Sequence, residues 1–196
     1  SFGSANQTLS IGPVLVNGVS VSPWSPTLSI AAAITSAGTL SISGGGVLQL
    51  GGASTFSGGV TVAADGGIAF AASSTGTPVT SGPVGTGTLT LNSGATLLAT
   101  GAATVGNPVS VLGDVRFGGT TALTLSGSVT FSAGTSTITV AAPAMVASLS
   151  GTLMGSNALV KEGYGTLVLG GVGNTNAGNW NTAGVGAIVV NAGSLE

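Results

Sequence analysis

Short triplets of the form apolar–polar–apolar recur along the chain at a nearly constant interval. Between Leu28 and Val129, successive triplets follow one another at intervals of about 20 residues. This alternation is typical of short β-strands, and a fixed period of this size is typical of a repeat architecture. The series comprises Leu9–Ile11, Leu28–Ile30, Leu48–Leu50, Ile68–Phe70, Leu89–Leu91, Val109–Val111, Val129–Phe131, Leu167–Leu169 and Ile188–Val190.

A second series of triplets lies between the members of the first. Leu40–Ile42 and Val60–Val62 are separated by the same interval, so each period holds two or three short strands. Glycine clusters such as residues 44–46 and 58–59 separate these strands, and glycine permits the positive φ that tight corners require. Because β-branched residues dominate the triplets and no capped helical period occurs, we expect an all-β chain.

A regular period with tight corners predicts a parallel β-solenoid in which each coil takes about 20 residues. Dividing the chain by this period gives roughly nine or ten coils stacked at the spacing of β-strands. The outer residues of each triplet are expected to point inward, and the middle residue outward. The predicted inner column is Ile30, Leu50, Phe70, Leu91, Val111 and Phe131, and the predicted outer column is Ser29, Gln49, Ala69, Thr90, Ser110 and Thr130. We also expect core positions for Phe56 and Phe117.

Composition narrows the functional classes. The chain has 196 residues, a net charge of −2, and no cysteine or histidine, while 43% of its residues are apolar and 3% charged. This length fits one domain over residues 1–196, and the scarcity of basic residues excludes electrostatic binding of nucleic acid. Ser, Thr or Gly interrupts every hydrophobic stretch, so we expect no membrane-embedded helix. Because residues 191–196 stop within an expected strand, we expect the sequence to be an excerpt of a longer polypeptide.

Catalytic chemistry has few candidates. A hydrolase or lyase needs an acid, a base or a bound metal, and the four acidic residues are far apart in the sequence. In the frame of the repeat, Asp65 and Asp114 are expected at different corners. Lys161 and Glu162 are interpreted as a solvated pair. We therefore predict no catalytic, metal-binding or cofactor-binding residues, and no enzyme.

Three corner loops are expected, near residues 22–26, 73–87 and 172–186. Trp24 lies in the first loop, between two prolines, and Trp180 lies in the third between Asn179 and Asn181. Exposed aromatic and amide side chains on loops are typical of contacts with glycans or partner proteins, so these four residues are candidate contact residues. The alternative is that each tryptophan covers an apolar edge beside its own loop.

Several segments resemble the passenger-associated repeat of bacterial autotransporters. They are residues 38–44 (GTLSISG), 48–70 (LQLGGASTFSGGVTVAADGGIAF), 159–171 (LVKEGYGTLVLGG) and 190–195 (VNAGSL). The last two contain the family's Lys-x-Gly-x-Gly-Thr-Leu and Val-x-Ala-Gly-x-Leu strands. Residues 176–184 depart from the family's Tyr-x-Gly-Gly corner. The resemblance implies a right-handed parallel β-helix in a bacterial outer-membrane or secreted protein, carried to the extracellular space or the cell surface by a route that the sequence leaves open.

Three functional hypotheses follow. The first is a non-catalytic structural or adhesive module, a stiff stalk or fibre segment that contacts cell-surface or matrix components, glycans or other copies of itself. The second is a β-solenoid that binds ice or polysaccharide through an array of hydroxyl groups. The third, which the scattered acids disfavour, is a carbohydrate-active β-helix enzyme.

Overall fold

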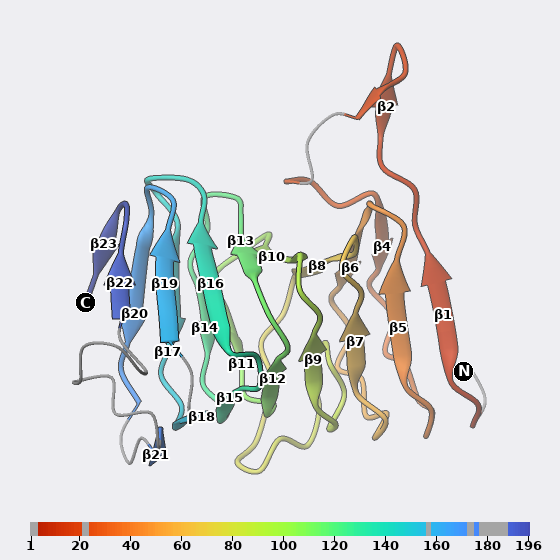
Figure 1. The fold of residues 1–196 in the computed structure, drawn as a ribbon. Helices are drawn as coiled ribbons and strands as arrows, with labels where there is room; N and C mark the ends of the chain where they lie inside the picture. The colour runs from red at the N-terminus through yellow and green to blue at the C-terminus, as the bar shows by residue number, and fades with distance from the viewer. Residues whose placement is uncertain (1–3, 21–23, 156–157, 172–174, 177–187) are drawn as a thin grey trace.

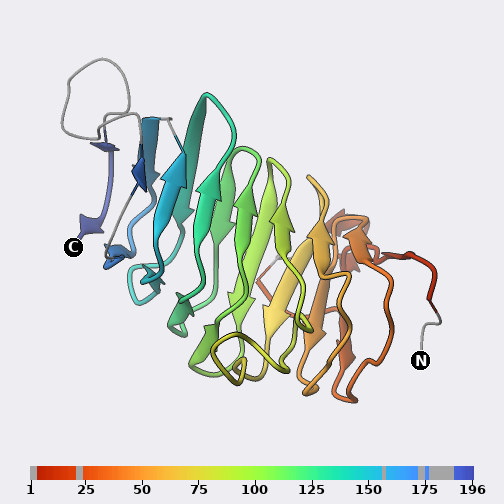
Figure 2. The ribbon, with the colours of Figure 1, turned by 90° about the horizontal axis from the view of Figure 1, so that it is seen from below.

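The chain forms a parallel β-solenoid. A computed structural model describes residues 4–20, 24–155, 158–171, 175–176 and 188–196, and every regular element in these ranges is a β-strand. Strands of successive coils lie side by side, so the coils stack one on the next from the N-terminal to the C-terminal end (Figures 1 and 2). The predicted all-β class and the predicted solenoid architecture are therefore confirmed.

Three parallel sheets form the walls of the solenoid. Sheet 1 contains, in spatial order, β1 (Gln7–Ser10), β5 (Leu40–Ser43), β7 (Val60–Val62), β9 (Leu89–Leu91), β12 (Val109–Val111), β15 (Val129–Phe131), β18 (Leu153–Gly155) and β21 (Thr175–Asn176). Sheet 2 contains β4 (Leu28–Ile30), β6 (Val47–Leu50), β8 (Gly67–Phe70), β10 (Ala95–Ala99), β13 (Val115–Phe117), β16 (Thr135–Val140), β19 (Ala158–Glu162) and β22 (Ile188–Val190). Sheet 3 begins later in the chain, with β11 (Ala103–Val105), β14 (Leu123–Leu125), β17 (Val146–Leu149), β20 (Thr166–Leu169) and β23 (Ser194–Leu195).

The solenoid makes about six turns, so the expected nine or ten coils are too many. The reason is that several coils are longer than the period of the triplets. Ile42 pairs with Val62, which fits that period, but Val62 pairs with Leu91 and Val129 pairs with Leu153 across longer insertions. The inserted residues lengthen these coils without adding a turn.

The predicted inner column is wrong in its connectivity, although its members do point inward. Ile30, Leu50 and Phe70 are in register in sheet 2, and their column continues to Ala99. Leu91, Val111 and Phe131 are in register in sheet 1, below Ile42 and Val62. The long coil between β7 and β9 places β9 about one period after β8 in the sequence, which imitates a single continuous series.

The predicted outer column divides in the same way. Ser29, Gln49 and Ala69 are in register in sheet 2, followed by Leu98. In sheet 1, serine or threonine occupies the outward position of six successive strands, which are Thr8, Ser41, Thr61, Thr90, Ser110 and Thr130.

The core is a continuous aliphatic column with phenylalanines in it. Phe56, Phe70, Phe117 and Phe131 are 1%, 0%, 1% and 4% exposed, which confirms their predicted core positions. Stacking of apolar side chains between successive coils removes them from water, and the parallel ladder satisfies the strand backbone. This arrangement explains how a chain with so few charges forms an ordered structure.

A β-hairpin leaves the solenoid near its N-terminal end. Strands β2 (Leu15–Val16) and β3 (Val19–Ser20) pair antiparallel around Asn17 and Gly18, whose φ angles are 51° and 75°. Positive φ at both central residues is the geometry of a tight hairpin turn. The hairpin projects from the body (Figure 1), and Leu15 and Val19 are more than half exposed.

The expected corner loop at 73–87 contains two isolated bridges, Thr75 to Ser81 and Ser54 to Gly82. Asn107, which is fully buried, holds this loop on the solenoid. Its side-chain amide donates to the carbonyl oxygens of Gly85 (3.0 Å) and Gly87 (2.8 Å), and its Oδ1 accepts from the Ser74 hydroxyl (3.0 Å). Of the other two expected loops, the start of 22–26 and most of 172–186 lie outside the described residues.

Candidate functional site

A groove runs over the outer face of sheet 2. It consists of two adjoining hollows, of about 390 Å³ and 590 Å³, that share Arg116, Thr137 and Thr139. The first hollow adds Ser93, Gly94, Asp114 and Val115, and the second adds Trp24, Ala141, Glu162, Gly163, Tyr164 and Ala192. We call this combined surface the sheet-2 groove.

The ladder of sheet 2 aligns one row of polar side chains along the floor of the groove. Thr96 of β10 is in register with Arg116 of β13, which is in register with Thr139 of β16 and then with Glu162 of β19. Side chains at matching positions of neighbouring strands lie on the same face of a sheet. The row therefore runs along the solenoid axis, with one side chain from each coil.

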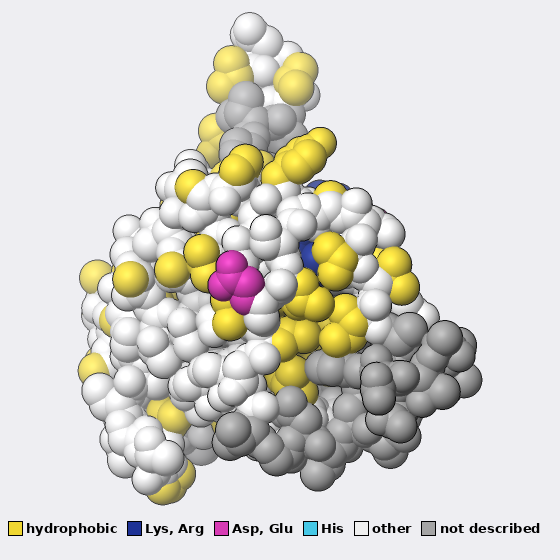
Figure 3. Space-filling model, turned by 90° about the vertical axis from the view of Figure 1, so that its left-hand side faces the viewer, with side chains coloured by type: hydrophobic (Ala, Val, Ile, Leu, Met, Phe, Trp, Pro, Cys, Tyr) yellow, Lys and Arg dark blue, Asp and Glu magenta, His cyan; other side chains and the backbone are white. Residues whose placement is uncertain are grey.

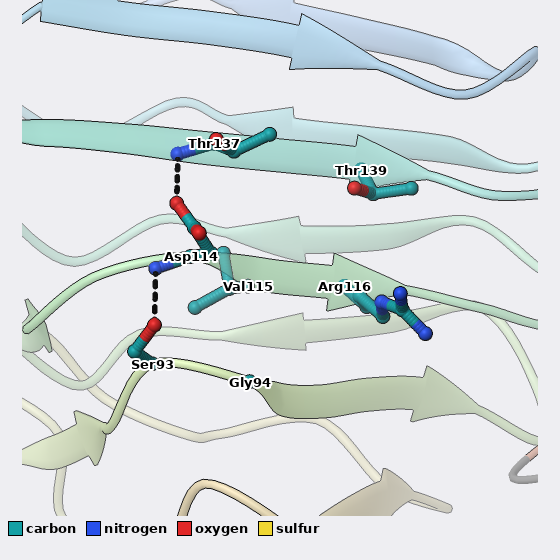
Figure 4. A pocket seen from close by; sticks show the side chains of 7 residues that line it. All are labelled: Ser93, Gly94, Asp114, Val115, Arg116, Thr137 and Thr139. Carbon is teal, nitrogen blue, oxygen red and sulfur yellow. Dashed lines mark hydrogen bonds between the residues drawn. The ribbon is translucent and has the colours of Figure 1, made fainter.

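Asp114 begins a second row beside the first. Its carboxylate Oδ1 accepts a hydrogen bond from the Thr137 backbone N–H (2.8 Å), and its own N–H donates to the Ser93 hydroxyl (3.2 Å). Figure 4 shows both bonds, with Arg116 and Thr139 next to each other further along the same face. The two bonds join three successive coils, and the bond from Thr137 orients the Asp114 carboxylate.

Trp24 forms one aromatic wall of the groove. Its half-buried ring packs on an apolar patch of the outer face of sheet 2, formed by Val47, Ala69 and Leu98. The ring also lies directly over Gly118, where an added Cβ would overlap it. The missing side chain at Gly118 thus makes the space in which the indole sits.

Tyr164 and Glu162 line the groove two strands further along sheet 2 than the site of Trp24 over Gly118. Tyr164 follows β19 at a corner and is 74% exposed, which leaves its ring accessible. The Glu162 Oε1 accepts a hydrogen bond from the Asn191 side-chain amide (2.7 Å), a contact with the next coil.

Lys161 is fully buried, so its interpretation as half of a solvated pair is wrong. It occupies an inward position of β19, beside Ile138 of β16. Its ammonium donates to the carbonyl oxygens of Glu162 (2.7 Å), Gly163 (2.7 Å) and Ala192 (3.0 Å). Burial lowers the pKa of this ammonium below its usual value, and the nearby Glu162 charge opposes that shift. Lys161 thereby holds the corner that presents Glu162 and Tyr164.

Asp65 and Asp114 lie at the same type of corner, between sheets 1 and 2, and not at different corners as expected. Asp65 precedes β8 and Asp114 precedes β13, two strands further along sheet 2. The Asp65 carboxylate accepts from the Gly44 N–H of the preceding coil (3.1 Å), whereas the Asp114 carboxylate accepts from the following coil. The two carboxylates thus face opposite directions along the axis. Among the described residues, no three Asp, Glu, His or Cys side chains cluster as metal ligands would.

The predicted contact residues have different outcomes. Trp24 covers an apolar patch, as the alternative interpretation expected, and it also lines the sheet-2 groove. Trp180, Asn179 and Asn181 lie outside the described residues. The contact role of all four residues stays a prediction.

Sequence analysis did not identify Arg116, Glu162 and Tyr164 as groove residues. They are separated by insertions that break the regular period, so their common face is visible only in the paired strands. The scarcity of charged and tyrosine residues in the sequence could have indicated them, because three of the six charged residues and the only tyrosine line this groove.

Comparison with protein-family models, with curated protein sequences and with solved structures gives no match. The class of the protein is therefore defined by its fold, a parallel β-solenoid, and by its groove. In the part of the chain that the structure describes, we find no helical segment with the length and hydropathy needed to cross a lipid bilayer.

Proposed function

We propose that this chain is a non-catalytic structural or adhesive module, a stiff segment of an extracellular bacterial surface protein. The observation that carries the proposal is the gathering of charged and aromatic side chains in one groove on a solenoid whose exterior otherwise has few charges. A ladder of parallel strands positions such side chains rigidly, which favours contact with an extended partner. The repeat resemblance of residues 159–171 and 190–195 supports the surface location and an autotransporter passenger as the parent protein.

The separation of the acidic residues in the groove supports a non-catalytic role. Asp114 and Glu162 lie two strand spacings apart along the axis and are offset along the strand direction as well. Their backbones are therefore separated by roughly 12 Å, and the Glu162 carboxylate is engaged by the Asn191 side-chain amide. The Asp114 carboxylate is in addition engaged by a backbone N–H.

Apolar side chains are exposed on the outer coil at the C-terminal end of the described residues. Val189 and Val190 of β22 are 44% and 45% exposed, and β22 is the last strand of sheet 2 in the described chain. Figure 3 looks onto this end and shows hydrophobic side chains gathered there. Exposed apolar side chains of this kind favour contact with another surface.

The test of the proposed function combines imaging with adhesion. We expect negative-stain images of the purified chain to show rods or end-to-end filaments, and we expect beads coated with the chain to adhere to bacterial cells or matrix. Beads coated with an unrelated protein of similar charge are the control. Adhesion equal to that control, or the release of short sugars from glycans by the purified chain, would contradict the proposal.

A second candidate function is binding to ice or to crystalline polysaccharide. The hydroxyl row of sheet 1, formed by the six outward Ser and Thr residues from Thr8 to Thr130, favours it because its members repeat at the strand spacing. A thermal-hysteresis measurement tests binding to ice, with Thr61→Val and Thr90→Val as variants. Thermal hysteresis that these variants abolish would support this function.

A further inference from the structure

We propose that the sheet-2 groove binds one extended, neutral polysaccharide chain that lies along the solenoid axis. This inference rests on the proposed function and names the ligand class of its contact surface. Three features of the groove support this inference. They are the fully paired strands of its floor, its two aromatic side chains, and its mixture of hydrogen-bond donors and acceptors.

The floor of the groove presents side chains to a ligand, and it contains no unpaired strand edge. The groove spans β10, β13, β16 and β19, each of which is paired with strands on both sides in sheet 2. A peptide that binds by adding a strand needs an unpaired edge, and this face has none. Recognition must therefore come from outward groups such as the guanidinium of Arg116 and the hydroxyls of Thr137 and Thr139.

The walls offer aromatic surfaces. Trp24 is held against Leu98 and Gly118, and Tyr164, which follows β19 two strands further along the axis, is 74% exposed. The C–H face of a sugar ring packs on an aromatic ring because the ring is flat, apolar and electron-rich. Tyrosine adds a hydroxyl that can bond to the same sugar.

The polar groups of the groove match hydroxyl groups, which both donate and accept hydrogen bonds. Arg116 supplies donors, Glu162 and Asp114 supply acceptors, and Thr139 supplies both. Two carboxylates against one guanidinium leave the groove without a positive charge excess. That balance suits a neutral glycan and opposes a polyanion.

The repeat of the floor sets the expected ligand length. From β10 to the corner after β22 the groove crosses four strand intervals, or roughly 20 Å. A pyranose in an extended chain advances by about one strand spacing, so the groove accommodates about four sugars.

Calorimetric titration of the purified chain tests the ligand class. The probes are neutral β-1,4-linked glucose and mannose oligomers of two, four and six sugars, with hexagalacturonate as the acidic comparison. We expect affinity for at least one neutral series to rise about tenfold or more from dimer to tetramer and to change little at the hexamer. Absence of binding to both neutral series, or binding of hexagalacturonate alone, overturns the inference.

Three variants locate the binding site. Tyr164→Ala is expected to weaken binding of the neutral hexamer about three- to tenfold, and Arg116→Gln about tenfold. Gly118→Ala retains Trp24 but displaces its ring, so it is expected to weaken binding several-fold. Val146→Ala, at an exposed apolar position on sheet 3, is the matched control and is expected to bind as the unaltered chain does.

Tyr164 and Arg116 are exposed, so both replacements are expected to keep the native circular dichroism spectrum. A change in affinity in these variants therefore reports on binding and not on folding. Hexamer affinity unchanged in both variants overturns the groove as the site. Beads that still adhere while no neutral glycan binds contradict this inference and leave the adhesive function standing. Beads that fail to adhere contradict the proposed function itself.

Discussion

Buried polar side chains link neighbouring coils at several points of this solenoid. Lys161 joins two successive corners through three carbonyl oxygens, and Ser54 accepts a hydrogen bond from the Ile34 N–H (2.9 Å) of an adjacent coil. Ser136 differs from them, because its buried hydroxyl has no hydrogen-bond partner among the described residues. These residues allow the contribution of single polar groups to be measured.

Lys161→Met is expected to destabilise the C-terminal coils by about 1 to 3 kcal/mol, because three partly buried carbonyl groups lose their donor. Burial lowers the Lys161 pKa below 10.5, so the unfolded chain binds more protons than the folded chain between the lowered pKa and 10.5. Stability should therefore rise with pH across that window in the unaltered chain. Urea unfolding at several alkaline pH values measures this rise, and an equal rise in Lys161→Met would contradict the assignment.

Ser136→Ala is expected to stabilise the chain by about 1 kcal/mol, because it removes a buried hydroxyl that lacks a partner. Ser54→Ala is the matched control with the opposite sign, since it removes the acceptor of the Ile34 N–H. Urea unfolding midpoints compare the two variants. A lower midpoint for Ser136→Ala would show that its hydroxyl is satisfied in solution.

At the scale of single elements, loop 73–87 decides how the strands are grouped. It lengthens the coil between Val62 and its partner Leu91, and the first strand of sheet 3, β11, comes in the next coil. Asn107 supplies the hydrogen bonds that hold this loop against the solenoid. The loop is therefore part of the ordered structure even though it contains no regular strand.

Asn107→Ala is expected to destabilise the chain by about 1 to 3 kcal/mol and to loosen this loop, because the carbonyls of Gly85 and Gly87 lose their donor. Limited proteolysis and hydrogen exchange of residues 74–87 measure the effect. Asn92→Ala, at a half-buried corner between β9 and β10, serves as the control. Equal protection of the loop in both variants would contradict this role of Asn107.

The strand triplets themselves were predictable, because alternation of apolar and polar residues reflects the local geometry of a β-strand. Leu159 and Lys161 illustrate the limit of the interpretation. The same alternation places both on the inner face of β19, which could have indicated that Lys161 is buried. Sequence alone assigns this charged side chain to solvent, because a buried ammonium needs hydrogen-bond acceptors. One of those acceptors, the Ala192 carbonyl oxygen, belongs to a corner that is distant in the sequence.

At the scale of the whole molecule, stability depends on uninterrupted apolar stacking between coils. Phe70 and Leu91 are both 0% exposed, but they belong to different sheets. Each contacts the coils above and below, so one defect in either column affects its neighbours. In this respect the stability of a solenoid differs from that of a globular domain with one central core.

Phe70→Asp and Leu91→Asp are each expected to abolish the native fold, because an unpaired carboxylate would enter an apolar interior. Phe70→Leu is the control and should cost only about 1 kcal/mol, since it keeps the site apolar. Circular dichroism and thermal melting distinguish the outcomes. A native spectrum and unchanged melting in either Asp variant would contradict the inward orientation of these side chains.

The amino-acid sequence by itself determined the class of fold: β-strands, tight corners, coils stacked in parallel and phenylalanines inside. These features depend on interactions between residues close in sequence and on a period that repeats. Tertiary structure alone decided the register, the number of turns and the groove, because each depends on which strands pair after insertions of unequal length. Thr96, Arg116, Thr139 and Glu162 form one row only because four such coils are aligned by the backbone ladder.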